Sequence, residues 1–169
     1  MRSRDDGRLA PESLGAHVGR LYRAAYGLCG SAQDAEDLVQ DTFERVLRRP
    51  RVLRNRDHDL AYLMSVMRNT WISSARGRRI ATVALEPEEL AEAATTTDDP
   101  VVAQVVEGGA LYAALSGLSE PLREAVVAVD VLGLSYREAA QALGCKEGTI
   151  MSRLHRARGQ LAAELQVEA

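Results

Sequence analysis

Hydrophobic residues recur at intervals of three and four positions along most of the chain, whereas the alternation typical of strands is nearly absent. In the first half this pattern predicts three amphipathic helices, over residues 11–28, 31–49 and 60–76. In the second half it predicts a weaker helix over 100–118, which two adjacent glycines disfavour, and a stronger one capped by Ser119. The chain is therefore expected to be all-α.

The apolar stripes of these helices define the expected core. Its members in the first three helices are Leu14, Val18, Leu21, Tyr22, Ala25, Ala35, Leu38, Val39, Thr42, Phe43, Val46, Leu47, Leu63, Val66 and Met67. In the helix that follows Ser119 they are Leu122, Val126, Val129 and Leu132. The single tryptophan, Trp71, is assigned to the core, with stacking on a base as the alternative.

Short polar motifs mark several helix ends. Ser31 is expected to cap a helix with an acidic first turn, in which Asp34 is three residues further on. Ser135 and Glu138 have the spacing of a capping box at the start of a short helix. Gly144 suits the left-handed turn that ends this helix, and the next helix begins near Glu147. Two short helices joined by such a turn predict a helix-turn-helix.

The second helix of this unit has a polar face suited to DNA. Residues 146–158 contain four basic residues and one acid, a local charge of +3. The residues that share the solvent-facing stripe are Lys146, Thr149, Ser152, Arg153 and Arg156. Arg158 lies off this stripe and is expected to contact backbone phosphate or solvent. The alternative is an ordinary helical hairpin with a solvated arginine face.

Composition divides the chain into two domains. Residues 84–99 combine clustered acids, alanines, three consecutive threonines and prolines nearby, which is typical of a linker. We therefore expect an N-terminal helical bundle over residues 8–80 and an acidic flexible linker over 81–105. A small C-terminal helix-turn-helix domain over 106–167 completes the expected organisation.

The net charge of −3 conceals an uneven distribution. Residues 1–79 have a net charge of +5, residues 80–118 a net charge of −7, and residues 119–169 a net charge of −1. An evenly spread acidic charge would argue against binding to nucleic acid. Because residues 1–79 are basic, the acidic total does not argue against binding to nucleic acid. The net charge of the whole chain therefore says little about its partners.

Several classes of protein are disfavoured. Cys29 and Cys145 are too few for a disulfide framework or a four-ligand zinc site, and His58 has no partner ligands at zinc spacing. No apolar run approaches the roughly 20 residues of a membrane span. The first residues lack the apolar stretch of a secretory signal, so the expected location is cytoplasmic.

Three segments resemble a known family. Residues Leu134 to Arg158 look like the promoter −35-binding region of bacterial extracytoplasmic-function sigma factors. Asp34-Ala-Glu-Asp-Leu-Val-Gln-Asp-Thr-Phe43 resembles the core-polymerase-binding helix of that family. Arg68-Asn69 followed by Arg76-Gly-Arg-Arg79 resembles its −10 element helix. The segments occur in the order of the family, and the resemblance covers about residues 10–165.

The resemblance implies three binding sites and no catalytic site. The residues implied for core polymerase are Asp34, Asp37, Gln40, Asp41 and Glu44. Those implied for the −10 element are Asn55, Arg56, His58, Arg68, Asn69, Arg76, Arg78 and Arg79. Those implied for the −35 element are Lys146, Thr149, Ser152, Arg153 and Arg156. For each acidic residue of the first set, a solvated face is an equal alternative.

The resemblance therefore implies an RNA polymerase sigma factor that directs core polymerase to promoters and assists their melting, without enzymatic activity, metal or cofactor. Its partners would be core RNA polymerase and promoter DNA, with an anti-sigma factor left open and no membrane. In the family the linker enters the nucleic-acid channel of polymerase, so the acidic linker here would imitate phosphate or act as a spacer.

Two other functions remain as alternatives. A stand-alone helix-turn-helix regulator would bind duplex DNA tightly without polymerase, whereas a sigma factor binds DNA weakly alone. A helical hydrolase would use clustered acids such as Asp34, Asp37 and Asp41, and it would require metal ligands or a perturbed acid–base pair in a cleft. The hydrolase is the least favoured.

Overall fold

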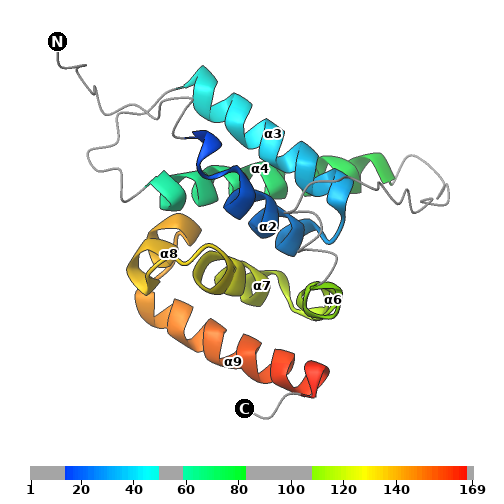
Figure 1. Cartoon of the computed structure of the whole chain (residues 1–169), viewed down its shortest axis with the longest axis vertical. Helices are drawn as coiled ribbons and strands as arrows, with labels where there is room; N and C mark the ends of the chain where they lie inside the picture. The colour runs from blue at the N-terminus through cyan, green and yellow to red at the C-terminus, as the bar shows by residue number, and fades with distance from the viewer. Residues whose placement is uncertain (1–13, 50–58, 83–107, 167–169) are drawn as a thin grey trace.

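The computed structural model describes residues 14–49, 59–82 and 108–166, with the helical backbone alone for residues 78–82. In chain order the elements are α2 (Val18–Cys29), α3 (Ala32–Arg48), α4 (Asp59–Thr82), α6 (Gly109–Gly117), α7 (Glu120–Val126), the π-helical turn η2 (Val127–Val131), α8 (Tyr136–Leu143) and α9 (Glu147–Leu165). Helices α2–α4 form one half of the molecule and α6–α9 the other (Figure 1). The described residues contain no strand, and the all-α prediction is confirmed.

The N-terminal half is a bundle in which α2 packs against both α3 and α4. Helix α2 ends at Gly30, whose φ of +77° is favourable for glycine because it has no Cβ. Ser31 starts α3, and its side chain accepts a hydrogen bond of 3.2 Å from the backbone N–H of Asp34. This confirms the predicted cap. Leu21 and Leu63 are fully buried between the helices, as their spacing predicts.

Two predictions about this half are wrong. Val18 and Leu47 were assigned to the core by their spacing, but they are 42% and 48% exposed. Val18 is the first residue of α2 and Leu47 lies in the last turn of α3, and no other helix among the described residues covers these ends fully. The third helix is also longer than predicted, since α4 extends from Asp59 to Thr82.

In the C-terminal half, α7 and η2 lie among α6, α8 and α9. Ser119 occupies the N-cap position of α7 as predicted, but its side chain makes no capping hydrogen bond. The sequence pattern does not predict η2, in which the backbone N–H of Leu132 donates to the carbonyl of Val127 at 3.0 Å. Leu122, Val126 and Leu132 are buried, in agreement with the apolar spacing.

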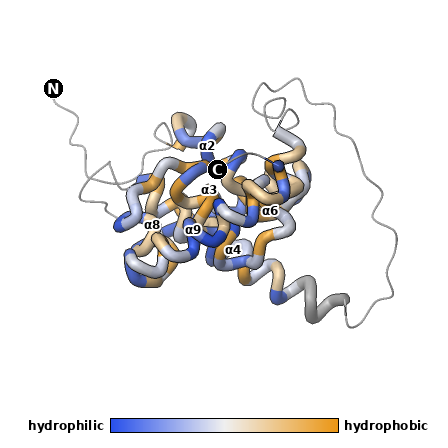
Figure 2. Tube along the Cα trace, turned by 90° about the horizontal axis from the view of Figure 1, so that it is seen from below, coloured by the Kyte–Doolittle hydropathy of each residue, from blue (hydrophilic) through white to orange (hydrophobic). Residues whose placement is uncertain are grey.

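The two halves pack against each other. Helix α2 contacts α6, α7 and η2, while α4 contacts α8 (Figure 1). The buried hydrophobic residues of both halves consequently belong to a single core cluster. Hydrophobic and hydrophilic residues both occur along the helices, as expected for amphipathic packing (Figure 2). The two helical domains expected from the sequence are thus present, but they are closed on each other.

Within the described residues, no helix is both long enough and apolar enough to span a bilayer.

The turn between α8 and α9 generates a prediction about stability. Gly144 has a φ of +65°, so Gly144→Ala is expected to destabilise the fold by about 1 kcal/mol in urea unfolding followed by circular dichroism. Gly148 lies in α9 with open space around it, and Gly148→Ala is the matched control. The control is expected to be neutral or to stabilise by up to about 1 kcal/mol. Equal effects of the two substitutions would contradict the role of Gly144.

Candidate functional site

The helix-turn-helix is built by local hydrogen bonds and a small core. The Ser135 side chain accepts a bond of 3.2 Å from the backbone N–H of Glu138, and the Glu138 carboxylate accepts one of 2.8 Å from the backbone N–H of Ser135. Both bonds of the predicted capping box are therefore present. Leu143 of α8 packs in the core with Ile150 and Leu154 of α9. This packing fixes the direction of α9 and leaves its other face to solvent.

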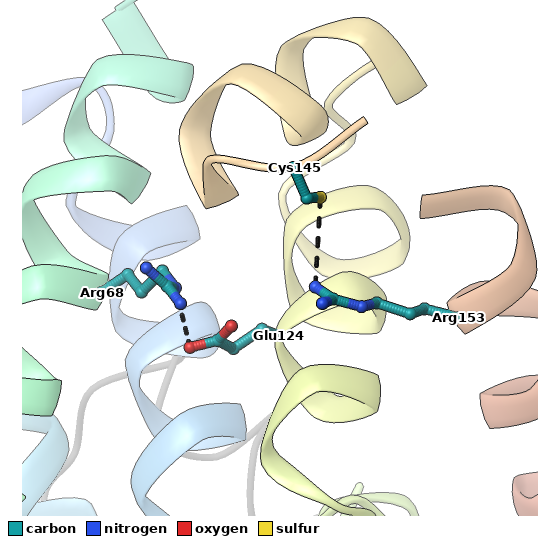
Figure 3. A network of polar contacts seen from close by, with 4 residues as sticks. All are labelled: Arg68, Glu124, Cys145 and Arg153. Atoms are coloured by element: carbon teal, nitrogen blue, oxygen red, sulfur yellow. Dashed lines mark hydrogen bonds and ion pairs between the residues drawn. The ribbon is translucent and has the colours of Figure 1, made fainter. Parts of the chain in front are cut away.

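The outer face of α9 carries the residues predicted for the −35 element. Lys146, Ser152 and Arg156 are exposed, whereas Thr149 and Arg153 are half-buried. A guanidinium nitrogen of Arg153 lies 4.0 Å from the Sγ atom of Cys145, in the turn before α9 (Figure 3). The side chain of Arg153 therefore points into the helix-turn-helix. Arg156 is the exposed arginine of the predicted set on this helix, and its Nε donates to the carbonyl of Ser152 at 3.5 Å.

Arg158 was expected to face phosphate or solvent, and the structure corrects this. Its guanidinium donates hydrogen bonds of 2.6 and 3.1 Å to the two carboxylate oxygens of Asp130 in η2. These hydrogen bonds raise the pKa of Arg158 and tie α9 to η2. The residue thus supports the position of the helix instead of presenting a free charge.

Helix α4 carries part of the set predicted for the −10 element. Asn69 and Arg76 are exposed on this helix, while Arg68 is half-buried. Arg78 and Arg79 lie in its last turns, where the side chains are not described. Asn55, Arg56 and His58 are outside the described residues. Trp71 is half-buried and packs against the core, in agreement with its assignment, and so does Phe43 in α3.

Arg68 contacts a carboxylate from the other half of the chain. Its Nε atom donates to Oε1 of Glu124 in α7 at 2.9 Å (Figure 3). The Glu124 side chain is only 3% exposed, and this burial raises the pKa of its carboxyl group, although the bond to Arg68 acts in the opposite direction. The positive charge of Arg153 also lowers that pKa. Glu124 therefore interacts with one arginine from each predicted DNA-binding helix.

Sequence reasoning missed Glu124. It is an acid in the largely apolar stretch of 122–132, and such a position indicates burial near a cation. Nothing in the sequence identifies the cation, because Arg68 is 56 positions away. Only the packing of α4 close to α7 and α8 brings the two charges together.

The predicted polymerase-binding residues lie along α3. Asp37, Gln40, Asp41 and Glu44 are exposed, and Asp34 is half-buried at the start of the helix. Glu44 accepts a hydrogen bond of 3.3 Å from Arg48, four residues later on the same surface. In Figure 1, α3 lies at the side of the molecule opposite α9. The acidic surface is therefore accessible while the two halves are packed together.

No group of three or more His, Cys, Asp or Glu side chains within the described part of the chain is arranged to hold a metal ion. Of the acids that the hydrolase alternative would use, Asp37 and Asp41 are exposed on α3 and Asp34 is half-buried at its start.

Comparison with known families gives two matches to this chain. The family Sigma-70 region 2 matches residues 14–80, and the family Sigma-70, region 4 matches residues 108–161. The first range includes α2, α3 and most of α4, and the second includes α6–α8 and most of α9. The two ranges thus correspond to the two packed halves.

Individual relatives are similar over most of this chain. The ECF RNA polymerase sigma factor SigE of Mycolicibacterium smegmatis is 39% identical over 155 residues, which cover 89% of this chain and 59% of SigE. This chain therefore spans less than two thirds of the length of SigE. EcfG, an ECF RNA polymerase sigma factor of Rhodopseudomonas palustris, is 36% identical over 153 residues, which cover 90% of this chain and 83% of EcfG.

Solved structures show the same arrangement of helices. The sigma factor RpoE of Bartonella quintana, in complex with the anti-sigma factor NepR, superposes with a TM-score of 0.73 at 29% identity. The match covers 94% of this chain and 97% of RpoE. CnrH, in complex with the cytosolic domain of CnrY, has a TM-score of 0.57 at 23% identity over 95% of this chain and 92% of CnrH. This second similarity supports the fold alone.

The raised pKa of Glu124 predicts a pH dependence of stability. The folded chain holds this proton more tightly than the unfolded chain, so Glu124 contributes stability below the ordinary pKa of 4.5. That contribution is lost as the pH rises through the pKa of the folded state. The free energy of unfolding is measured in urea for the wild type and for Glu124→Gln. The wild-type value minus the variant value is expected to increase as the pH falls from 7 to about 4.5.

The control for this measurement is Glu164→Gln, which changes an exposed carboxylate on α9. The pH dependence of the difference should be larger for Glu124→Gln than for the control. The same dependence for both variants would contradict the assignment of the raised pKa to Glu124.

Proposed function

The chain belongs to the extracytoplasmic-function RNA polymerase sigma factors, and we propose that it divides promoter recognition between the two helical halves described above. As a sigma factor it directs core polymerase to promoters and takes part in transcription initiation. The observation that carries this function is the presence of region 2 and region 4 in order, each containing a helix that we propose to bind DNA. Sigma factors are initiation factors without catalysis, and we propose no enzymatic role for this chain.

Helix α9 would bind the −35 element in the major groove. The exposed side chains of Lys146, Ser152 and Arg156 lie on one face, as a recognition helix requires. Arg156 can reach base edges or phosphate with a bidentate guanidinium. Thr149 and Arg153 would contribute from the same face, although Arg153 must turn outward from Cys145 to do so.

Helix α4 would bind the −10 element together with the segment before it. Asn69 and Arg76 are exposed, and Arg68, Arg78 and Arg79 add positive charge on the same helix. Melting a promoter exposes bases and single-stranded phosphates, which arginine and asparagine side chains bind through charge and hydrogen bonds. Asn55, Arg56 and His58 are proposed to complete this site.

The acidic surface of α3 would bind core polymerase. An accessible cluster of carboxylates suits a basic partner surface, because complementary charge speeds association and fixes orientation. The residues proposed for this contact are Asp34, Asp37, Gln40, Asp41 and Glu44. Residues 8–80 and 106–167 would form the two domains, with 81–105 as the linker that enters the polymerase channel.

We further propose that the chain acts in the cytoplasm, where core polymerase works, and that an anti-sigma factor binds it. The support for this partner is the similarity to RpoE of Bartonella quintana, which was solved with the anti-sigma factor NepR. RpoE superposes over 94% of this chain, so the helices of both halves have counterparts in a protein that binds such a factor.

The sigma function is tested by run-off transcription with purified core polymerase on fragments of the genome that encodes the chain. Adding the chain is expected to produce new transcripts and to give a complex that co-purifies with core polymerase. A stand-alone regulator would instead bind duplex DNA tightly and produce no transcript with core polymerase alone. That result would overturn the proposed function.

The proposed −35 contact is tested by Arg156→Ala on a promoter found in the run-off assay. Loss of one arginine contact with DNA is expected to weaken −35-dependent initiation about tenfold, or roughly 1.4 kcal/mol, and to leave core binding intact. Arg20→Ala removes an equally exposed charge from α2, outside the proposed interface, and is the matched control. Equal losses from the two variants would contradict the role of α9.

The proposed polymerase contact is tested by Asp41→Arg on α3, with Glu164→Arg on α9 as the control for charge reversal. Placing a positive charge against a basic surface is expected to lower the affinity for core polymerase by at least about tenfold. The control is expected to retain its affinity. Affinities are measured by fluorescence anisotropy of labelled chain titrated with core polymerase, and unchanged binding of Asp41→Arg would contradict the proposed surface.

A further inference from the structure

One large apolar side chain lies on the otherwise polar outer face of α9. Met151 is 55% exposed, more than any other large hydrophobic residue that the structure describes. It takes no part in the hydrophobic core, whereas Ile150 and Leu154 beside it are almost completely buried. Packing within the chain therefore does not account for an apolar residue at this position, and its role concerns a molecule outside the chain.

The buried residues of α9 define where Met151 lies on the helix. Successive residues of an α-helix are turned by about 100° about its axis. Ser152 is two positions from both Ile150 and Leu154, so it projects from the side opposite the core. Met151 lies on one side of Ser152 on this exposed face, and Arg156 lies on the other. The outer face of α9 therefore has a basic edge and an apolar edge.

The charges around Met151 favour a base edge over phosphate as its target. Its exposed neighbours three and four positions away are Glu147, Gly148 and His155. None of them is a lysine or an arginine, and the carboxylate of Glu147 repels phosphate. Contacts with the DNA backbone depend on positive charge, so this edge is poorly suited to them. Arg156, on the other edge, is suited to phosphate.

The approach to Met151 is open. It is the fifth residue of α9, which begins at Glu147, and residues near the start of a recognition helix contact base edges. A Cβ atom built at Gly148, three positions before Met151, would meet no atom of another helix within 4 Å. The major groove of a DNA duplex can therefore come close to this side of the helix.

The chemistry of methionine restricts what this side chain can recognise. Its thioether has no hydrogen-bond donor and is only a weak acceptor, so it cannot distinguish bases by hydrogen bonds. Its unbranched chain adapts readily to irregular apolar surfaces. The apolar feature of the major groove is the C5-methyl group of thymine, which the other bases lack. A thymine methyl group is thus the part of a base edge that suits Met151.

We propose that Met151 determines specificity by packing against the C5-methyl group of one thymine in the −35 element. This inference rests on the proposed function of α9, and it adds an apolar contact to the polar contact proposed for Arg156. Burial of the methyl group against the side chain removes apolar surface of both from water. The −35 elements that this chain uses are accordingly expected to share one thymine at a fixed position.

The contact is tested by replacing thymine with uracil, which removes the methyl group and keeps every hydrogen-bonding atom of the base. Each thymine of a −35 element found in the run-off assay is replaced in turn, on either strand. Fluorescence anisotropy measures the affinity of each labelled duplex for the complex of the full chain with core polymerase. For one thymine, the wild-type complex is expected to bind about fourfold more weakly after replacement, which corresponds to one buried methylene.

Met151→Ala removes the apolar partner of the methyl group. At the position that is sensitive in the wild type, its complex is expected to bind the thymine and uracil duplexes equally. Leu111→Ala truncates an exposed apolar residue of α6 and is the matched control, which is expected to retain the wild-type difference. Met151 is exposed, so its substitution should leave the fold intact, and circular dichroism checks this for both variants.

Two results would overturn the proposal while the sigma function stands. One is transcription from promoters in which no thymine of the −35 element is sensitive to loss of its methyl group. The other is a difference between thymine and uracil that persists in Met151→Ala, which would assign the methyl contact to another residue. If the chain produces no transcript with core polymerase, the sigma function and this inference fail together, so the run-off assay distinguishes the two kinds of failure.

Discussion

Helix α2 is packed on two sides, and this double packing joins the halves of the molecule. On one side it contacts α3 and α4, and on the other it contacts α6, α7 and η2. Such packing requires small residues, and Ala24, Ala25 and Gly27 are all buried in this helix. Burial of apolar surface on both sides gives the interface its main driving force, since each buried methylene contributes about 0.8 kcal/mol. The polar contacts of Arg123 and Arg68 then determine how the halves are aligned.

The structure changes the meaning of the charge pattern. The arginines of the N-terminal half and of α9 suggest two basic surfaces, but several of them are used within the molecule. Arg68 pairs with Glu124 and Arg158 pairs with Asp130, and Arg123 of α7 likewise bonds to carbonyls at the ends of two helices. Each of these contacts lowers the positive charge available to DNA. The pairing of these arginines and the net charge of −3 both weaken the electrostatic attraction of the free chain for DNA.

The predictable part of the candidate site consists of features whose cause is local. The Ser31 cap, the Ser135–Glu138 capping box and the left-handed Gly144 depend on residues within four positions of each other, so a sequence pattern can identify them. The spacing of apolar residues by three and four positions predicts the core residues of the helix-turn-helix in the same way. The core assignments of Val18 and Leu47 were wrong, because the spacing of apolar residues within one helix cannot show where a neighbouring helix ends.

The sequence alone determined the all-α class, the order of the main helices, the division into two domains and most of the residues that each helix buries. These properties follow from backbone hydrogen bonding and from apolar spacing, which act over a few residues. Only the tertiary structure decided that the domains pack together, that Gly27 permits a close approach, and that Glu124 meets Arg68. These contacts join residues that are 56 to 100 positions apart. Their formation depends on the fit of whole surfaces, which no local pattern records.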